Sequence, residues 1–137
     1  MLLIDTDVLL DVFEDDPTWA DWSVRQLRAQ AQVHELFINP IVYAELSLAF
    51  ESPDAVDAAI DALELGHQAL PRAALFLAGR AFVKYRRAAG AKANILPDFF
   101  IGAHAAVAGC GIVTRDAAKY RMYFPGVHLI TPETTET

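Results

Sequence analysis

The sequence has only one cysteine, Cys110, which excludes an internal disulfide and gives no basis for a structural zinc site. It has no apolar run of the roughly 18–20 residues that a membrane-spanning helix needs. Its N-terminus shows neither a basic stretch ahead of an apolar one nor a small-residue cleavage site. We therefore expect a cytoplasmic protein that does not associate with a membrane.

Motifs that mark several common functions are also missing. None of the four histidines lies in H-x-x-x-H or H-E-x-x-H spacing: His34, His67, His104 and His128. The chain has no G-x-G-x-x-G or Walker sequence either. These absences disfavour a histidine-bound metal centre and a nucleotide site built on a glycine-rich loop.

Positive charge is scarce. With 11 Lys and Arg against 18 Asp and Glu, the net charge is −7, which argues against a general nucleic-acid coat. Residues 1–64 contain 14 of the 18 acids and two bases, a net −12, whereas residues 65–137 have a net +5. One half could then bind cations and the other a polyanion. Solvated faces of different sign would give the same asymmetry.

Apolar residues make up 54% of the 137 residues, which is enough for a well-filled core in one compact domain. We find no internal repeat, low-complexity tract or linker. The sequence therefore predicts a single domain over residues 1–132, followed by a loose C-terminal tail at 133–137.

Short apolar segments alternate with longer segments of helical pattern. The predicted strands cover residues 2–4, 36–38, 112–113 and 127–130. The predicted helices cover residues 8–13, 17–30, 40–50, 54–65, 71–89 and 97–108. This alternation predicts an α/β domain with a central parallel sheet.

Four carboxylates lie where the local pattern would favour an apolar or neutral residue. They are Asp5, Glu45, Asp98 and Asp116. Asp5 directly follows a predicted strand, Asp116 lies two residues past Thr114 just after another, and Asp98 begins an apolar helix. Glu45 has apolar neighbours at helical spacing, including Leu48 and Ala49, so we expect its face of the helix to be largely buried.

Each of these acids also has a purely structural interpretation. Asp5 and Asp116 could cap the helices that follow them, and the helix dipole would stabilise Asp98 in a first helical turn. Glu45 could pair with an arginine, because a buried carboxylate needs a partner or a raised pKa.

The combination of the four acids favours a metal site. Ligands bind outside the carboxyl ends of the strands in an open parallel sheet, and Asp5 and Asp116 lie at such ends. The helices of Glu45 and Asp98 follow extended segments and can lean over the same edge. Four carboxylates gathered there would repel one another unless a divalent cation joined them. Oxygen ligands favour Mg²⁺ or Mn²⁺, which activates water and neutralises charge on a phosphate.

The same residues resemble the motifs of a known family. Residues 2–10, LLIDTDVLL, resemble the opening of PIN domains. Three later segments are similar to the remaining PIN motifs in the same order: residues 41–46 (IVYAEL), 96–105 (LPDFFIGAHA) and 114–116 (TRD). The length and single-domain organisation look most like VapC-type toxins of bacterial or archaeal toxin–antitoxin pairs.

This resemblance implies a PIN-like three-layer domain, with a central parallel sheet of about five strands flanked by helices. It implies a Mg²⁺- or Mn²⁺-dependent endoribonuclease that cleaves RNA, forms a homodimer and is inhibited by a cognate VapB-like antitoxin. It also implies four residues that are both catalytic and metal ligands: Asp5, Glu45, Asp98 and Asp116.

The resemblance extends to the neighbours of these acids. Thr6 and Thr114 would be hydroxyls that orient a carboxylate or a water behind the metal ligands. Asp7 departs from the family pattern, in which Asn or Ser is commoner. A fifth acid could strengthen metal binding, but we favour a cap of the following helix.

Basic residues concentrate in one segment. Five of them lie within thirteen positions: Arg80, Lys84, Arg86, Arg87 and Lys92. They could guide an RNA backbone toward the acidic site, with Tyr85 nearby to stack a base. A solvated helix face, with basic residues favoured at its C-terminal end, would show the same pattern.

Two other functions fit parts of the sequence. Asp5 and Asp7 after a strand resemble the paired aspartates of haloacid-dehalogenase-like phosphatases, where Asp5 would be the nucleophile, but Glu45 has no role there. A non-catalytic PIN-fold module that only binds a partner would keep the fold without the chemistry. An RNA-cleavage assay separates the nuclease from the phosphatase, and titration with Mg²⁺ or Mn²⁺ separates it from the binding module.

Overall fold

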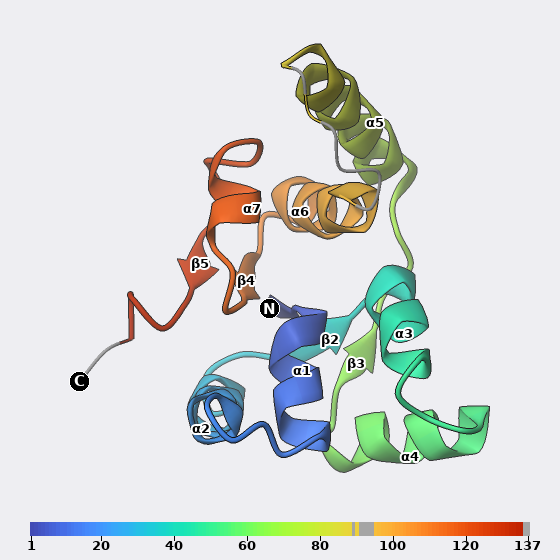
Figure 1. The fold of residues 1–137 in the computed structure, drawn as a ribbon, viewed down its shortest axis with the longest axis vertical. Coiled ribbons are helices and arrows are strands. Elements are labelled where there is room, and N and C mark those ends of the chain that lie inside the picture. Colours follow the sequence, from blue (N-terminus) through green and yellow to red (C-terminus); the bar gives the residue numbers. More distant parts are fainter. Residues whose placement is uncertain (89, 91–94, 136–137) are drawn as a thin grey trace.

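The computed structural model describes residues 1–88, 90 and 95–135, with a parallel sheet at its centre (Figure 1). The strands are β1 (Leu2–Ile4), β2 (Leu36–Ile38), β3 (Gly66–His67), β4 (Gly111–Val113) and β5 (Leu129–Ile130). Their order is β3-β2-β1-β4-β5. Leu3 pairs with Phe37 of β2 on one side and with Ile112 of β4 on the other. The strands that follow β1 are therefore added first on one side of it and then on the other, so the strand order reverses at β1. This reversal is the topological switch point of the sheet, which we call the crossover point.

Helices flank this sheet (Figure 1). They are α1 (Thr6–Phe13), α2 (Ala20–Ala31), α3 (Pro40–Ser47), α4 (Pro53–Ala62), α5 (Arg72–Arg87), α6 (Leu96–Ala108) and α7 (Ala118–Arg121). The α/β architecture with a five-stranded parallel sheet confirms the predicted fold class. Within the residues described, none of these helices is long and apolar enough to cross a membrane.

The core is built around the short strands. Leu3 and Ile4 of β1, Ile38 of β2, and Ile112 and Val113 of β4 have no exposed surface. Strands buried on both faces consist of continuous apolar residues, which is why each appears in the sequence as a short apolar run. The polar residues that follow them are therefore held at fixed points on the sheet edge.

Asn39 joins α3 to α6. Its Oδ1 accepts the backbone N–H groups of Ile41 and Val42, both at 3.0 Å, and so caps α3. Its Nδ2 lies 3.1 Å from Nδ1 of His104 in α6. Because an amide nitrogen only donates, Nδ1 accepts, and the imidazole is neutral with its proton on Nε2. Both side chains are almost fully buried.

A glycine brings the chain after β4 close to α6. A Cβ atom at Gly102 would lie 2.4 Å from the ring of Phe124, so only glycine allows this approach. The contact places α7, which precedes Phe124, beside α6. Residues of these two helices can therefore meet over the carboxyl edge of the sheet.

The structure differs from the expected elements mainly at their ends. The sequence does not predict β3 or α7, because β3 has two residues without an apolar run and α7 has four residues and no side-chain cap. The helix expected from residue 17 begins at Ala20, because Asp16 accepts the N–H of Trp19 at 2.8 Å in a turn. Helices α3 and α4 end three residues before the expected 50 and 65. The last strand is confined to Leu129–Ile130, and the end expected for α5 at residue 89 lies outside the described residues.

Candidate active site

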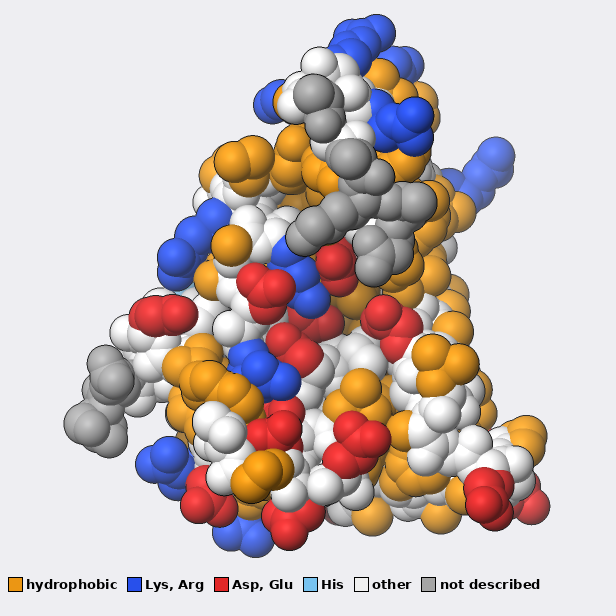
Figure 2. Space-filling model, viewed as in Figure 1, with side chains coloured by type: hydrophobic (Ala, Val, Ile, Leu, Met, Phe, Trp, Pro, Cys, Tyr) orange, Lys and Arg blue, Asp and Glu red, His pale blue; other side chains and the backbone are white. Residues whose placement is uncertain are grey.

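The centre of the site is the carboxyl edge of β1 and β4. Asp5 follows β1 and Thr114 follows β4, and the Asp5 backbone N–H donates to the Val113 carbonyl at 3.0 Å. Because these two strands are neighbours at the crossover point, the residues after them meet where ligands of open parallel sheets bind. Figure 2 shows acidic side chains gathered in the middle of this face of the molecule.

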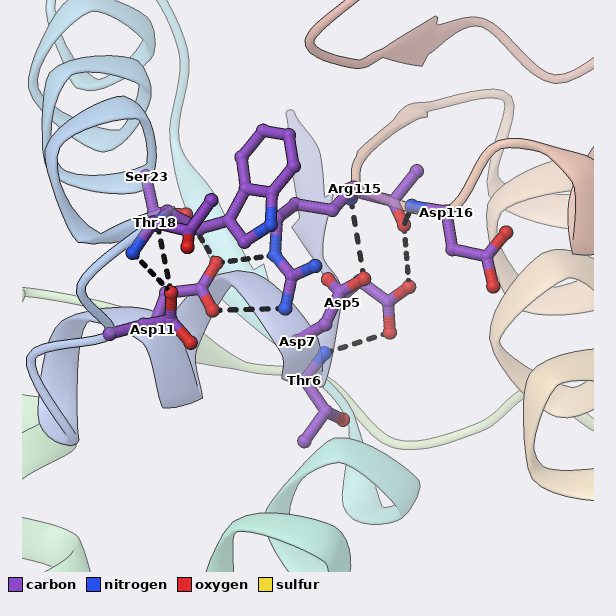
Figure 3. A network of polar contacts seen from close by, with 11 residues as sticks. Asp5, Thr6, Asp7, Asp11, Thr18, Ser23, Arg115 and Asp116 are labelled. Atoms are coloured by element: carbon purple, nitrogen blue, oxygen red, sulfur yellow. Dashed lines mark hydrogen bonds and ion pairs between the residues drawn. The ribbon is translucent and has the colours of Figure 1, made fainter.

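Asp5 is 1% exposed, and both of its carboxylate oxygens accept hydrogen bonds. Oδ1 accepts the backbone N–H of Thr6 at 2.8 Å, which makes Asp5 the cap of α1 as one structural interpretation expects (Figure 3). Oδ2 accepts the hydroxyls of Thr114 and Tyr120, each at 2.8 Å. Burial, followed by the charge of Asp5, raises the pKa of Tyr120 well above its ordinary value, so the phenol remains a donor.

Lys119 of α7 bridges two of the predicted acids. Its Nζ lies 3.1 Å from Oδ2 of Asp5 and 3.2 Å from Oδ1 of Asp98. Burial disfavours the charge of this ammonium, but Asp5 and Asp98 outweigh that effect and hold the pKa of Lys119 above its ordinary value. Asp5 and Asp98, which are distant in the chain, thus converge on one cationic nitrogen.

Glu45 is half-buried and faces the same site. Its Oε1 accepts the hydroxyl of Thr6 at 2.6 Å, and among the described residues no arginine forms an ion pair with it, as the alternative interpretation of Glu45 would require. Burial raises the pKa of Glu45, with Asp5 and Asp98 acting in the same direction against the Thr6 hydrogen bond. The expectation of a largely buried helix face is wrong, because α3 ends at residue 47 and Leu48 is 89% exposed.

Asp98 lies in the first turn of α6, where the helix dipole favours an acid. Burial raises its pKa, and the charges of Asp5 and Asp116 add to this effect, whereas Lys119 opposes it. The electrostatic interactions of Asp98 therefore extend to Asp5, Asp116 and Glu45. These interactions link the four predicted acids to one another.

Asp116 is the exposed member of this set. Its backbone N–H donates to the Thr114 hydroxyl at 3.1 Å, and the same hydroxyl donates to Asp5. Helix α7 begins two residues later with Ala117 as its cap residue and has no side-chain cap. The interpretation of Asp116 as a helix cap is therefore wrong.

Asp7 lies in the first turn of α1 behind Asp5, and the cap of that helix is Asp5, so the capping role favoured for Asp7 is wrong. Its Oδ2 accepts the backbone N–H of Arg115 at 3.3 Å. Its Oδ1 is buried, and no described residue donates to it. Burial, followed by the charge of Asp5, raises the pKa of Asp7 to about 7. At neutral pH this carboxyl therefore adds less than a full negative charge to the site.

A salt bridge fixes the loop that carries Asp116. Arg115 donates from Nε to Oδ2 of Asp11 at 2.6 Å and from Nη2 to Oδ1 at 3.0 Å (Figure 3). The Ser23 hydroxyl donates to the same Asp11 at 2.8 Å, and the guanidinium lies 5.2 Å from the Trp19 ring centroid. The loop after β4 is thereby held against α1 and α2.

Sequence reasoning missed four residues of this polar network: Asp11, Arg115, Lys119 and Tyr120. Asp11 shows a usable signal, because it stands between apolar residues of an amphipathic helix, as the predicted acids do. Lys119 and Tyr120 follow Asp116 by three and four residues, the spacing at which a helix would bring them to the same side. That signal depends on a helix too short to predict.

The donors of the site suit a hard divalent ion, since they are carboxylate and hydroxyl oxygens. Asp5 and Asp98 already share one cation, the Lys119 ammonium, which shows that their oxygens can face a common charge. Over residues 1–88, 90 and 95–135, however, no three carboxylate, imidazole or thiolate groups are arranged so that they could hold a metal ion together. The residues therefore fit a divalent ion in chemistry, and side chains must move to admit it.

The predicted basic patch lies on α5. Arg80, Lys84, Arg86 and Arg87 are exposed, and Lys92 lies outside the described residues. The guanidinium of Arg80 lies over the ring of Phe76 at 4.9 Å. Lys and Arg side chains of this helix appear at the upper end of the face in Figure 2, away from the acidic centre.

A family model described as the PIN domain matches residues 2–125. No curated protein matches this sequence. Among solved structures, VapBC2 from Rickettsia felis, bound to a DNA fragment from their promoter, is similar with a TM-score of 0.73 and 18% identity, covering 95% of this chain and 97% of that one. FitAcB from Neisseria gonorrhoeae is similar with a TM-score of 0.68 and 18% identity, covering 97% of this chain and 99% of that one. A toxin–antitoxin complex from Klebsiella pneumoniae is similar with a TM-score of 0.66 and 22% identity, covering 96% of this chain and 98% of that one.

At these identities the structural matches show a shared fold. The family model reaches further, because it runs from β1 past α7 and includes Asp5, Glu45, Asp98 and Asp116. Its match covers most of the chain, and the fold around the acidic edge agrees with it. The chain therefore belongs to the PIN domain family.

Proposed function

We propose that this chain is a Mg²⁺- or Mn²⁺-dependent endoribonuclease that acts as the toxin of a VapBC-type toxin–antitoxin pair. One observation carries the proposal. Oδ2 of Asp5 and Oδ1 of Asp98 lie 3.1 Å and 3.2 Å from the same cationic nitrogen, in an oxygen-lined site at the carboxyl edge of the sheet. Such an arrangement suits a cation that acts on a phosphodiester.

Four residues would hold the cation: Asp5, Glu45, Asp98 and Asp116. Asp5 is the fixed member, because four donors and its burial leave it little freedom. Glu45 is oriented by the Thr6 hydroxyl, which occupies Oε1 and leaves Oε2 for a ligand. Thr114 holds both Asp5 and the backbone of Asp116, so a single hydroxyl sets the spacing of these two acids.

When bound, the metal supplies a lowered pKa for a coordinated water and charge neutralisation at the phosphate. The chain contributes the position of each oxygen. In the metal-free site, burial raises the pKa of both Glu45 and Asp98. A bound divalent ion would favour the ionised form of both carboxyls, so they would serve as ligands.

The RNA substrate needs a basic surface to approach an acidic site. The exposed face of α5, with Arg80, Lys84, Arg86 and Arg87, is our candidate for contacts with the phosphate backbone. Lys92 was predicted as part of this surface and stays a prediction. Tyr85, which is half-buried and stacks on Phe82, is a weaker candidate for stacking a base.

The toxin role is supported by the solved structures that share this fold, which include VapBC2 and a toxin–antitoxin complex. By the same analogy we propose a VapB-like antitoxin as the partner and a homodimer as the assembly. Membership of the PIN family also favours a nuclease over the phosphatase that Asp5 and Asp7 suggested from the sequence.

A metal-dependence assay tests the enzymatic part of this proposal. The purified chain should cleave a fluorophore-quencher RNA in Mg²⁺ or Mn²⁺ and not in EDTA, and should leave p-nitrophenyl phosphate intact. Asp98→Asn should lower RNA cleavage by at least about a hundredfold. Asp61→Asn, which removes an exposed acid of α4, is the matched control and should retain full activity.

Three results would contradict the enzymatic part. Cleavage that persists in EDTA, or that survives in Asp98→Asn, would come from another nuclease or another site. A chain that neither cleaves RNA nor binds Mn²⁺ by calorimetry would be the non-catalytic binding module.

A further inference from the structure

Lys119 is anchored in the site more firmly than a surface lysine. Its side chain is 17% exposed, and its Nζ contacts Asp5 and Asp98 at the same time. The next residue, Tyr120, is fully buried and donates its hydroxyl to the same Oδ2 of Asp5. Gly102 allows the segment after α7 to pack against α6. The ammonium therefore has a defined position between the two carboxylates.

The positive charge of the Lys119 ammonium partly neutralises the acidic side chains around it. Burial and mutual repulsion act on Asp7, Glu45 and Asp98, and Lys119 opposes the pKa rise of each. Another nearby cation, Arg115, is engaged by both oxygens of Asp11. Among the described residues of the metal-free protein, Lys119 is thus the cation that contacts Asp5 and Asp98.

A divalent ion needs the same oxygens. Mg²⁺ binds oxygen at about 2.0–2.1 Å, so an ion held by Asp5 and Asp98 would lie within the space that the ammonium now occupies. Two cations sharing that space would also repel each other strongly. The lysine stem is long and the side chain is 17% exposed, so the ammonium can leave without a change in the backbone.

We propose that the Lys119 ammonium and the divalent cation compete for one position between Asp5 and Asp98. Lys119 is then a built-in counter-cation: it stabilises the metal-free site and weakens the affinity for metal. This inference rests on the proposed metal dependence, and it predicts opposite effects of Lys119 on two measurable quantities. By this inference, Lys119 of α7 sets the concentration of free Mg²⁺ or Mn²⁺ at which the site becomes occupied.

The test is a calorimetric titration of Mn²⁺ into the purified chain, combined with thermal unfolding in EDTA. Lys119→Gln removes the charge and keeps a polar group of similar reach. We expect its Kd for Mn²⁺ to fall at least tenfold and its Tm in EDTA to fall by several degrees, with recovery at saturating Mn²⁺. The matched control is Arg121→Gln, which removes an exposed charge from the same helix and should change the Kd by less than twofold.

A second variant covers the case in which Lys119→Gln does not fold. Lys119→Arg keeps the charge, and we expect it to retain the wild-type Tm in EDTA and to bind Mn²⁺ no more tightly than the wild type. A gain in affinity in Lys119→Arg would overturn the proposal, because a cation at this position would then not be competing.

The remaining outcomes separate this inference from the proposed function. If the wild type binds Mn²⁺ and cleaves RNA while Lys119→Gln binds with equal or lower affinity, the competition is refuted and the nuclease stands. If the wild type and all variants neither bind Mn²⁺ nor cleave RNA, both fail. Binding by Lys119→Gln alone, with none by the wild type, would support the competition in its strongest form.

Discussion

Replacing Arg115 by methionine is expected to destabilise the fold by about 3 kcal/mol, because it leaves Asp11 buried without its cation. The Asp11 side chain is 3% exposed, and its two oxygens accept from Nε and Nη2 of Arg115 at 2.6 Å and 3.0 Å. Removing one member of a buried ion pair costs about 3–5 kcal/mol. The Arg115 side chain is 26% exposed and Ser23 still donates to Asp11, so we place this pair at the lower end of that range.

Urea unfolding followed by circular dichroism at pH 7.5 measures this loss, and a fall in Tm of about 10 °C should accompany it. A second change, Asp11→Asn, should restore at least half of the stability to Arg115→Met, because it removes the uncompensated charge and keeps an acceptor for Ser23. Arg121→Met, an exposed change, should cost less than about 0.5 kcal/mol. The reasoning fails if Arg115→Met matches this control, or if the double variant is no more stable than the single one.

Burial lowers the pKa of His104, so the unfolded chain takes up a proton more readily than the folded protein, and stability is lost as the pH falls below the ordinary histidine value of about 6.5. Urea titrations measure how much the free energy of unfolding falls between pH 7 and pH 5. This fall should be smaller for His104→Gln than for the wild type, and the glutamine amide oxygen can still accept from Asn39. Equal falls in the two proteins would contradict this reasoning. Lys84→Ala combined with Arg87→Ala should weaken RNA binding in EDTA and reduce the slope of log affinity against log salt by about 1.4. An unchanged slope would remove α5 from the RNA-binding surface. In the metal-free protein, Asp98→Asn should change the free energy of unfolding by less than about 1 kcal/mol, because burial already favours the neutral form of this carboxyl. A much larger loss would make the contact with Lys119 a structural ion pair.

The sequence predicts those elements that a short local pattern marks, such as an apolar run that forms a buried strand or a capping residue followed by proline. Strands β1 and β2 are apolar runs of three residues, each followed by a polar residue, and the structure has both at the predicted bounds. Strand β4 was expected over residues 112–113 and begins one residue earlier, at Gly111. Asn39 and Ser52, each followed by a proline, mark the starts of α3 and α4 correctly. Asp5 could be assigned to the sheet edge for the same reason, since it follows a buried strand directly.

The missed features depend on contacts between distant segments. Lys119 gains its position from the packing of α7 on α6, which Gly102 allows, and neither α7 nor that contact has a periodic pattern in the sequence. Strand β3 consists of two exposed residues at the sheet edge, so no apolar run marks it. Glu45 was expected on a buried face because helix length cannot be read from apolar spacing when no cap follows, and α3 ends before Leu48.

The amide of Asn39 has a mechanical consequence for the two helices that carry Glu45 and Asp98. Its oxygen ties the start of α3 and its nitrogen ties the middle of α6, so one buried side chain couples the positions of both helices. Neither helix can shift to fit an incoming ion without breaking that link. Adaptation of the site must then come from side-chain rotation and from α7, the shortest helix among the described residues.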